Sequence, residues 1–396
     1  MNPFWQPLAV FLTVALAIGL RFIPKLRGYQ FTAWIIAAVT AAMIFPTAFL
    51  KWGDFNLRDK WLMLVIIQFV MFGMGTQMSL KDFTGIVKTP RGVLVGILCH
   101  FSVMPLVGYG LTRLFHFEPE IAAGIILIGS CSSGLASNVM AYIARSNLVL
   151  SVTVTAITTM IAPLMTPRLM QWLAGELVTV SVLKMTMDII EVVLVPIGAA
   201  LLHDYLKSAA PRGRKIVHGI VAFGVAWIVF LVCGGWVKIK SSSGEGMIAV
   251  ATIFGFMLAA VIAGLIYHEL VKRFARIEKV MPVLSMFGIV YFTLVTTAAG
   301  RDNLMKVGAL LFLASVIHNA AGYAFGYWFS RLAKLDKSSA RSVSFEVGLQ
   351  NGGMAAAIAN SMNMLGTMGL AAAIFSPWMN ISGSVLANYW RKRQPK

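Results

Sequence analysis

The sequence predicts an all-α polytopic membrane protein with about 13 transmembrane helices. Of its 396 residues, 58% are hydrophobic and only 12% are charged, whereas soluble domains average about 25% charged residues. Apolar stretches of the ~20 residues needed to span a bilayer recur along the whole chain. These stretches do not alternate polar and apolar residues as the strands of an outer-membrane barrel do. The composition therefore excludes a soluble multidomain enzyme and a disordered chain.

The apolar stretches define thirteen candidate spans, and no hydrophilic stretch between them is long enough for a soluble domain. The first span is short, and Pro163 and Pro167 are expected to break the sixth. In chain order, the spans cover residues 4–20, 31–50, 61–80, 92–114, 119–144, 147–174, 179–203, 216–237, 246–268, 279–299, 304–329, 342–361 and 364–390.

The basic residues predict how these spans are oriented. With the N-terminus outside, 23 of the 33 Lys and Arg residues fall in inside loops or in the C-terminal tail, as the positive-inside rule requires. We therefore expect a multi-pass protein of an inner or plasma membrane with a cytoplasmic C-terminus. The net charge of +18 reflects this topology, and no nucleic-acid partner is expected.

Ionisable side chains inside a membrane are functional candidates because each costs roughly 2.5–3.5 kcal/mol to insert. Asp188 and Glu191 share a helical face with Lys184, so they are interpreted either as a functional site or as a self-neutralising cluster. Glu346 has no basic residue within four positions on its helical face. It is the stronger candidate.

Two predicted spans contain polar, glycine-rich breaks. One runs from 344 to 353 and combines Glu346 with Gln350, Asn351 and three glycines, and the other runs from 129 to 138. A helix that unwinds there offers carbonyl, carboxylate and amide oxygens to a cation. Close packing of a glycine-rich helix against a protonated Glu346 is the alternative for the first break. Ser151 and Thr155 lie one turn apart at the start of the next span and face one way.

The positions of the breaks predict a 5+5 inverted repeat. Without span one and the pair eight and nine, two sets of five spans remain, and each break falls in the fourth span of its set. Under the predicted topology the two sets run in opposite directions. Inverted-repeat transporters place two such discontinuous helices together near the midplane.

Several stretches carry a resemblance to the bile acid:sodium symporter family. Glu-Val-Gly-Leu-Gln-Asn at 346–351 and Ala-Ser-Asn-Val at 136–139 are the most specific of them. The resemblance extends over about 31–205 and 280–392. Its remaining motifs are Met-Phe-Gly-Met-Gly at 71–75, Leu-Lys-Asp-Phe at 80–83, His318 with Asn319, Gly322 with Tyr323, and Trp378 with 380–383.

This resemblance implies a panel of helices and a core in which two broken helices cross. It also implies how the chain is divided. Residues 1–30 would be an extra N-terminal helix and 31–178 the first repeat. The second repeat would begin with 179–206 and continue with 279–396, interrupted by an inserted helical pair at 207–278.

The resemblance also implies a sodium cofactor and two sodium sites. The substrate would contact Leu135, Asn351 and Asn380. The first sodium site would use Ser137, Asn138, Ser151, Thr155 and Glu346, and the second would use His100, Glu346, Val347, Leu349 and Gln350.

Three departures from the family pattern bear on function. His100 stands where a Gln is expected, and a protonated ring could stand in for the second cation, which would make coupling partly proton-linked or limit it to one sodium. Alternatively, His100 hydrogen-bonds a serine and the second sodium binds. Leu135 and Met379 stand where many relatives carry Thr and His, which predicts a more apolar cavity.

The sequence thus predicts a sodium-coupled importer of an organic carboxylate or sulfonate that works by alternating access in the lipid bilayer. A monomer is the simplest expectation. A proton-coupled carrier, an exporter of another anion, and a channel or sensor on the same fold remain alternatives. An intramembrane enzyme is disfavoured because the sequence contains no nucleophile elbow, zinc-protease motif or paired membrane aspartates.

Overall fold

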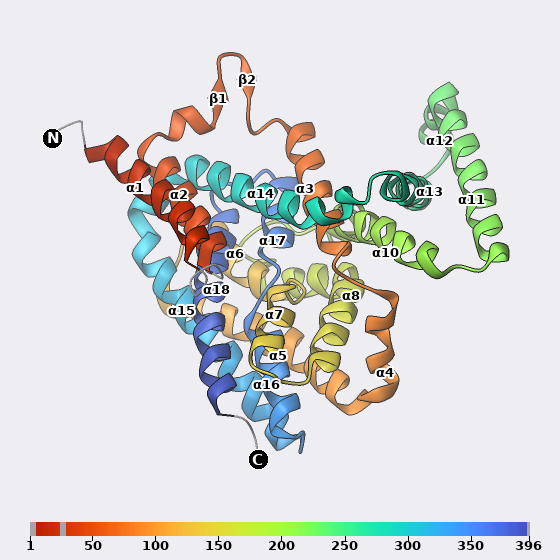
Figure 1. Cartoon of the computed structure of the whole chain (residues 1–396). Coiled ribbons are helices and arrows are strands. Elements are labelled where there is room, and N and C mark those ends of the chain that lie inside the picture. The colour runs from red at the N-terminus through yellow and green to blue at the C-terminus, as the bar shows by residue number, and fades with distance from the viewer. Residues whose placement is uncertain (1–4, 24–28, 394–396) are drawn as a thin grey trace.

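A computed structural model describes residues 5–23 and 29–393, and this part of the chain is almost entirely helical (Figure 1). The helices form one body, from which a helical hairpin projects on one side. The elements are α1 (Trp5–Gly19), η1 (Leu20–Phe22), α2 (Gln30–Ile44), η3 (Pro46–Phe49), β1 (Lys51–Trp52), β2 (Phe55–Asn56), α3 (Lys60–Gly75), η4 (Leu80–Thr84), α4 (Gly85–Lys88), α5 (Pro90–Phe115), α6 (Pro119–Ser130), α7 (Ala136–Ile143), α8 (Leu148–Ala174), α9 (Val182–Ile189), η5 (Ile190–Leu194), α10 (Val195–Ser208), α11 (Pro211–Phe230), η6 (Leu231–Gly235), α12 (Trp236–Ser242), α13 (Glu245–Arg273), α14 (Arg276–Ala299), α15 (Arg301–Leu332), α16 (Lys337–Gly348), α17 (Gly352–Ser361) and α18 (Gly369–Lys392).

The predicted polytopic membrane fold is confirmed. Nine continuous helices of the described chain are long and apolar enough to cross a membrane. A tenth crossing arises if the pair Trp61–Gly75 and Leu80–Lys88, bent by 59°, counts as one span, and α2 and α6 are shorter apolar helices. Each of the thirteen predicted segments contains one of the helices or part of one. The number of crossings and the inverted symmetry stay predictions.

The body consists of two groups of packed helices. We call α2, α3, α10 and α14 the panel, because α14 packs on α2 and α3, and α10 packs on α3. We call α5 to α8 together with α15 to α18 the core. The two groups meet where α17 and α18 of the core contact α3, α14 and α2 of the panel.

Two core helices are broken near their middle, and the breaks cross each other. α6 ends at Ser130 before α7 begins, and α16 ends at Gly348 before α17 begins. The connecting segments run antiparallel: the Gly134 amide donates to the Leu349 carbonyl at 3.0 Å, and the Asn351 amide donates to the Ser132 carbonyl at 2.9 Å. We call these segments the crossing. They satisfy backbone groups that a broken helix would otherwise leave unpaired.

The expected break in the sixth span was wrong, because α8 runs unbroken from Leu148 to Ala174 with Pro163 and Pro167 inside it. Pro167 has no amide hydrogen, so it cannot bond the carbonyl of Pro163 one turn earlier. The hydroxyl of Thr186 on the neighbouring α9 donates to that carbonyl at 2.9 Å. A tertiary contact thus replaces the lost helical bond.

The third span also differs from its prediction, because α3 ends at Gly75 and not near residue 80. The hydroxyl of Thr76 donates to the carbonyl of Gly73 at 2.7 Å, and Ser79 forms a capping box with Asp82 that starts η4. We call residues 76–84 the linker, because they join α3 of the panel to the core. The linker is held on the core side by Thr153 of α8, which donates to the Asp82 carbonyl.

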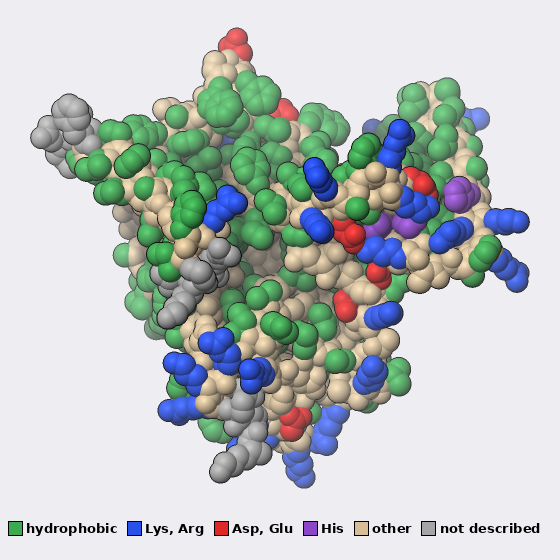
Figure 2. Space-filling view, in the orientation of Figure 1, with side chains coloured by type: hydrophobic (Ala, Val, Ile, Leu, Met, Phe, Trp, Pro, Cys, Tyr) green, Lys and Arg blue, Asp and Glu red, His purple; other side chains and the backbone are tan. Residues whose placement is uncertain are grey.

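The residues predicted as an inserted pair form the projecting hairpin of Figure 1. α11 packs on α13, and α13 packs on α10. We call α11 to α13 the inserted hairpin. Within it, Gly234 adopts φ +103° and bends the first arm at η6. In Figure 2, Lys and Arg side chains gather at the end that carries the C-terminus and around the inserted hairpin.

The crossing leaves no room for a side chain at residue 134. A Cβ atom there would lie 2.6 Å from the Gln350 carbonyl oxygen, so we expect Gly134→Ala to lower the free energy of unfolding by about 1–3 kcal/mol. Thermal unfolding in detergent measures this. Gly110→Ala is the control, because a Cβ at Gly110 meets nothing within 4 Å. Equal stability of the two variants would contradict the described packing.

Candidate functional site

The candidate site lies where α16 reaches the crossing. This helix is buried from Ser339 to Gly348 although it is not apolar. Its serine hydroxyls have partners: Ser344 donates to the Tyr323 carbonyl at 2.7 Å, and Ser342 donates to the Asn147 carbonyl at 2.8 Å. These bonds allow a polar helix to lie in the core. They bring Glu346 to the centre of the protein.

The Glu346 side chain is fully buried, and two hydroxyls of α8 face its carboxylate. Ser151 donates to Oε1 at 2.5 Å and Thr155 donates to Oε2 at 2.7 Å. Within the described chain no Lys, Arg or His side chain lies within 4 Å of this carboxylate. The site therefore holds a buried acidic group that no basic side chain neutralises.

The hydroxyl groups around Glu346 contact more acceptor oxygens than they have hydrogens to donate. The Asn138 amide oxygen lies 2.9 Å from the Ser151 hydroxyl and 3.1 Å from the Thr155 hydroxyl. Each hydroxyl carries one hydrogen, so two hydrogens serve four contacts, two to Glu346 and two to Asn138. The oxygens of Glu346, Asn138, Ser151 and Thr155 are thus gathered within hydrogen-bond distance of one another. This donor set is the kind that a hard cation prefers.

Ser137 completes this group from the first turn of α7. Its hydroxyl donates to the Gly134 carbonyl at 2.8 Å and lies 3.2 Å from the Thr155 hydroxyl. The structure thus brings together all five residues predicted for the first sodium site. We call them the oxygen cage: Ser137, Asn138, Ser151, Thr155 and Glu346.

The residues predicted for the second sodium site lie nearby, and most of their main-chain oxygens already have hydrogen-bond partners. Nδ1 of His100 lies 2.9 Å from the Glu346 carbonyl oxygen, and Nε2 lies 2.8 Å from the Cys131 carbonyl oxygen. The Gln350 amide donates to the Val347 carbonyl at 2.7 Å, and the Leu349 carbonyl accepts from Gly134. The partners of His100 are main-chain carbonyls, so the bond to a serine that was one of the two alternatives is not present.

His100 therefore connects the two breaks of the crossing through main-chain atoms. A neutral imidazole has one N–H and can donate to one of the two carbonyls, whereas an imidazolium can donate to both. Among the residues predicted for the second sodium site, Gln350 has a buried Oε1 atom without a hydrogen-bond partner in the described chain. It is the one side-chain oxygen of these residues with no protein donor.

A cavity of about 320 Å³ opens between the core and the panel beside the crossing. The three predicted substrate residues, Leu135, Asn351 and Asn380, all line it. The first turns of α7 and α17 also border it, through Ala136 and Gly352. No Lys, Arg or His lines this cavity among the described residues. Its other walls are largely apolar and include Met74, Met140, Met286 and Met379.

The acidic residues of the seventh span lie elsewhere. Lys184, Asp188 and Glu191 line a separate cavity of about 260 Å³, together with Asn360 and Asn363 near the end of α17. In the part of the chain that the structure describes, no ion pair within 4 Å joins Lys184 to Asp188. The expectation of a self-neutralising cluster is therefore not met at Asp188.

Asn319 was part of a family motif in the sequence, but no role in the site was predicted for it. Asn319 of α15 donates to the Gly348 carbonyl at 2.8 Å and accepts a bond from the Ser382 hydroxyl at 2.6 Å. It thereby satisfies the last carbonyl of α16 and connects α15 to α18. The signal was present, because a buried Asn beside His318 in an apolar span requires partners.

The chain is similar in sequence to known sodium-dependent transporters. A model of the sodium bile acid symporter family matches residues 64–243. The chain is 31% identical over 378 residues to the uncharacterized sodium-dependent transporter YocS of Bacillus subtilis (strain 168), which covers 95% of each chain. It is 28% identical over 377 residues to the probable sodium/metabolite cotransporter BASS1, chloroplastic, of Arabidopsis thaliana, covering 95% of this chain and 77% of that protein.

A mammalian protein and a solved structure extend the comparison. The human ileal sodium/bile acid cotransporter is 26% identical over 293 residues, which are 72% of this chain and 65% of that protein. The sodium proton antiporter MjNhaP1 from Methanocaldococcus jannaschii, solved at pH 8, superimposes with a TM-score of 0.58 over 99% of each chain at 12% identity. This second likeness concerns the fold alone.

The contacts of His100 predict its effect on stability. His100→Leu leaves the carbonyls of Cys131 and Glu346 without their side-chain donor, which should cost about 1–3 kcal/mol for each carbonyl that loses its bond. His100→Gln keeps a donor and should cost less. Thermal unfolding compares both with Ser102→Ala, whose hydroxyl bonds only its own helix at Leu98. If His100→Leu unfolds at the same temperature as the wild type, the hydrogen bonding of His100 to these carbonyls is contradicted.

Proposed function

This chain belongs to the sodium bile acid symporter family, and from that premise we propose that it is a sodium-coupled importer of an organic anion. It is a multi-pass membrane protein and a sodium-dependent transporter of a small molecule, like the relatives described above. Those relatives are transporters, which excludes the intramembrane enzyme considered from the sequence. The plasma membrane, the inside C-terminus and the anionic substrate belong to the proposal.

The oxygen cage is the observation that carries this proposal. Glu346 is fully buried, has no basic partner, and shares two hydroxyl hydrogens with Asn138. A sodium ion bound there would neutralise the carboxylate and take up the unused lone pairs. Because the cage joins α7, α8 and α16, such binding would also stabilise the crossing in one arrangement.

The same arrangement supplies a reason for coupling sodium to an anion. No basic residue of the described chain lines the cavity beside the crossing, so a bound anion has no counter-charge from these side chains. With the cage empty, the charge of Glu346 opposes an anion nearby, and with sodium bound it does not. The N-terminal ends of α7 and α17 then offer partial positive charge to a carboxylate or sulfonate.

The walls of the cavity favour an anion with an apolar body. Met74, Met140, Met286 and Met379 provide flexible, polarizable contacts, while Asn351 and Asn380 provide amide groups at the border of the crossing. Movement of the core against the panel, with the linker as the connection, would expose this cavity to the two sides in turn.

We further propose one sodium ion per transport cycle. The carbonyls of Val347 and Leu349 accept bonds from Gln350 and Gly134, and His100 lies within hydrogen-bond distance of the Glu346 carbonyl. Of the residues predicted for the second site, Gln350 supplies one buried side-chain oxygen without a donor in the described chain, whereas in the oxygen cage four contacts to Glu346 and Asn138 share two hydroxyl hydrogens. We therefore propose the first site as the coupling site.

Sodium should stabilise the purified protein selectively. A ligand that binds only the native state adds about 2.7 kcal/mol at a concentration one hundred times its Kd. We expect Na⁺ to raise the unfolding temperature more than K⁺ does, and Glu346→Gln to abolish the difference. Ser344→Ala is the control, because this hydroxyl lies on the same helix and bonds Tyr323 outside the cage. An equal response to Na⁺ and K⁺ would refute the site.

The cavity assignment predicts a defect in uptake without a defect in sodium binding. Asn380→Leu removes a polar group from the cavity wall and should raise the KM of sodium-driven uptake about fivefold to tenfold, the effect of one lost hydrogen bond. Asn388→Leu is a matched control, since Asn380 and Asn388 both bond the carbonyl one turn earlier on α18 but only Asn380 lines the cavity. Equal KM values for the two variants would exclude the cavity as the substrate site.

A further inference from the structure

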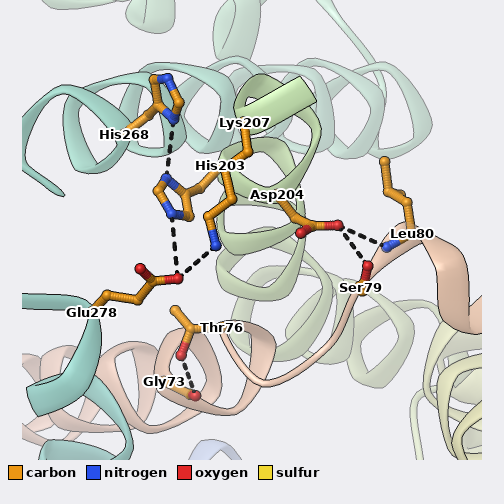
Figure 3. A network of polar contacts seen from close by, with 9 residues as sticks. All are labelled: Gly73, Thr76, Ser79, Leu80, His203, Asp204, Lys207, His268 and Glu278. Carbon is orange, nitrogen blue, oxygen red and sulfur yellow. Dashed lines mark hydrogen bonds and ion pairs between the residues drawn. The ribbon is translucent and has the colours of Figure 1, made fainter. Parts of the chain in front are cut away.

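One turn of α10 contacts three other parts of the structure on the predicted cytoplasmic side (Figure 3). His203 faces His268 of the inserted hairpin, Lys207 faces Glu278 at the start of α14, and Asp204 faces the linker. These residues take no part in the oxygen cage or in the cavity beside the crossing. They lie where the inserted hairpin, the panel and the linker meet.

The contact between the two histidines depends on their protonation. Their Nδ1 atoms lie 3.1 Å apart, and both side chains are buried, each with 4% of its surface exposed. We call His203 and His268 the histidine pair. Such a bond needs a hydrogen on one Nδ1 and a free lone pair on the other. The pair can therefore exist with both rings neutral or with one ring protonated, but not with both protonated.

The surroundings of the histidine pair do not offset two added charges. The Nε2 atom of His203 lies 3.9 Å from the Glu278 carboxylate, which is too long for a hydrogen bond, and Lys207 contacts the same carboxylate at 2.5 Å. Three basic and three acidic side chains face the pair, along with one tyrosine; they are Lys207, Arg214, Lys272, Asp204, Glu269, Glu278 and Tyr267. Basic and acidic side chains around the pair are thus equal in number, and α3 contributes the uncharged Phe72, whose ring packs on Tyr267.

The closed contact also leaves some polar atoms without hydrogen bonds, and an open form of the contact would supply them. The Nε2 atoms of both histidines and the hydroxyl of Tyr267 are buried without hydrogen-bond partners. Water that reached these atoms on opening would supply partners that the closed form lacks. A second proton therefore adds repulsion to a contact that already leaves polar atoms unpaired.

The neighbouring Asp204 relates this contact to the linker. Its carboxylate accepts the Ser79 hydroxyl at 2.8 Å and the Leu80 amide at 3.1 Å. These bonds attach the start of η4 to the panel, while Thr153 attaches the Asp82 carbonyl to the core. Asp204 directly follows His203, so a displacement of His203 would also disturb the bonds that position the linker.

We propose that the histidine pair is an acid-sensitive contact that holds the inserted hairpin on α10 while at most one ring is protonated, and that it opens when both are protonated. On the predicted topology it would respond to cytoplasmic acidification. Opening would change the support of the linker and slow transport, a consequence that rests on the function proposed above. The opening itself does not depend on that function.

Hydrogen exchange on the full chain in lipid nanodiscs tests the opening. We compare pH about 7.5 with pH about 5, on either side of the ordinary histidine pKa of about 6.5, after correction for the intrinsic effect of pH on exchange. The last turns of α13, residues 262–273, should exchange about tenfold faster or more at the lower pH as the local contact opens. Residues of α5 in the core should not change.

Substitutions identify the groups responsible. Neither His268→Gln nor His203→Gln can form two facing imidazolium rings, so each should remove the acid-induced increase, and either variant suffices if the other does not fold. His218→Gln is the control, because His218 is exposed on α11 and bonds only the Arg214 carbonyl of its own helix. No acid-induced increase in the wild type, or an increase that persists in both pair variants, would overturn the proposal. Sodium-dependent stabilisation in the same samples reports separately on the transport function.

Discussion

A carboxylate buried without a basic partner is the constraint on which the rest of this structure depends. Such a group is strongly unfavourable in a low-dielectric interior unless something neutralises it. Here two hydroxyl groups, of Ser151 and Thr155, contact both Glu346 and the amide oxygen of Asn138. Their two hydrogens do not suffice for these four contacts. A bound cation would both neutralise the carboxylate and contact the oxygens that receive no hydrogen. The crossing positions this group, because it holds α7 and α16 close enough for Asn138 and Glu346 to face the same two hydroxyls of α8.

The position of the cage explains why one ion can influence a cavity formed by other residues. Ser137 and Asn138 lie in the first turn of α7, directly after Leu135 of the cavity wall, and Asn351 follows Glu346 by five residues across the crossing. His100 lies within hydrogen-bond distance of a main-chain carbonyl in each of the two breaks, independently of any ion. The panel contributes the apolar side of the cavity, and the linker joins the panel to the core. The proposed ion, anion and helix movement would therefore act on one small region.

Residue chemistry could indicate the parts of this site: a lone Glu in a glycine-rich apolar span, a second polar break, and two hydroxyls one turn apart. The set of five residues was what the family resemblance implied, and the structure brings those five residues together. Bonds between distant segments could not be predicted. Pro163 and Pro167 looked like a helix break, but Thr186 of another helix bonds the carbonyl that Pro167 leaves free. The partners of His100, the early end of α3 at Gly75, and the contact between His203 and His268 likewise depend on which helices become neighbours.

The most direct measurement of the central claim is equilibrium binding of radioactive sodium to the purified protein, with K⁺ as competitor. The account predicts saturable binding of about one Na⁺ per chain that excess K⁺ does not displace. It predicts loss of that binding in Glu346→Gln and retention in Ser344→Ala. Binding that survives in Glu346→Gln, or that K⁺ displaces as readily as Na⁺ does, would contradict the claim that the oxygen cage is the coupling site.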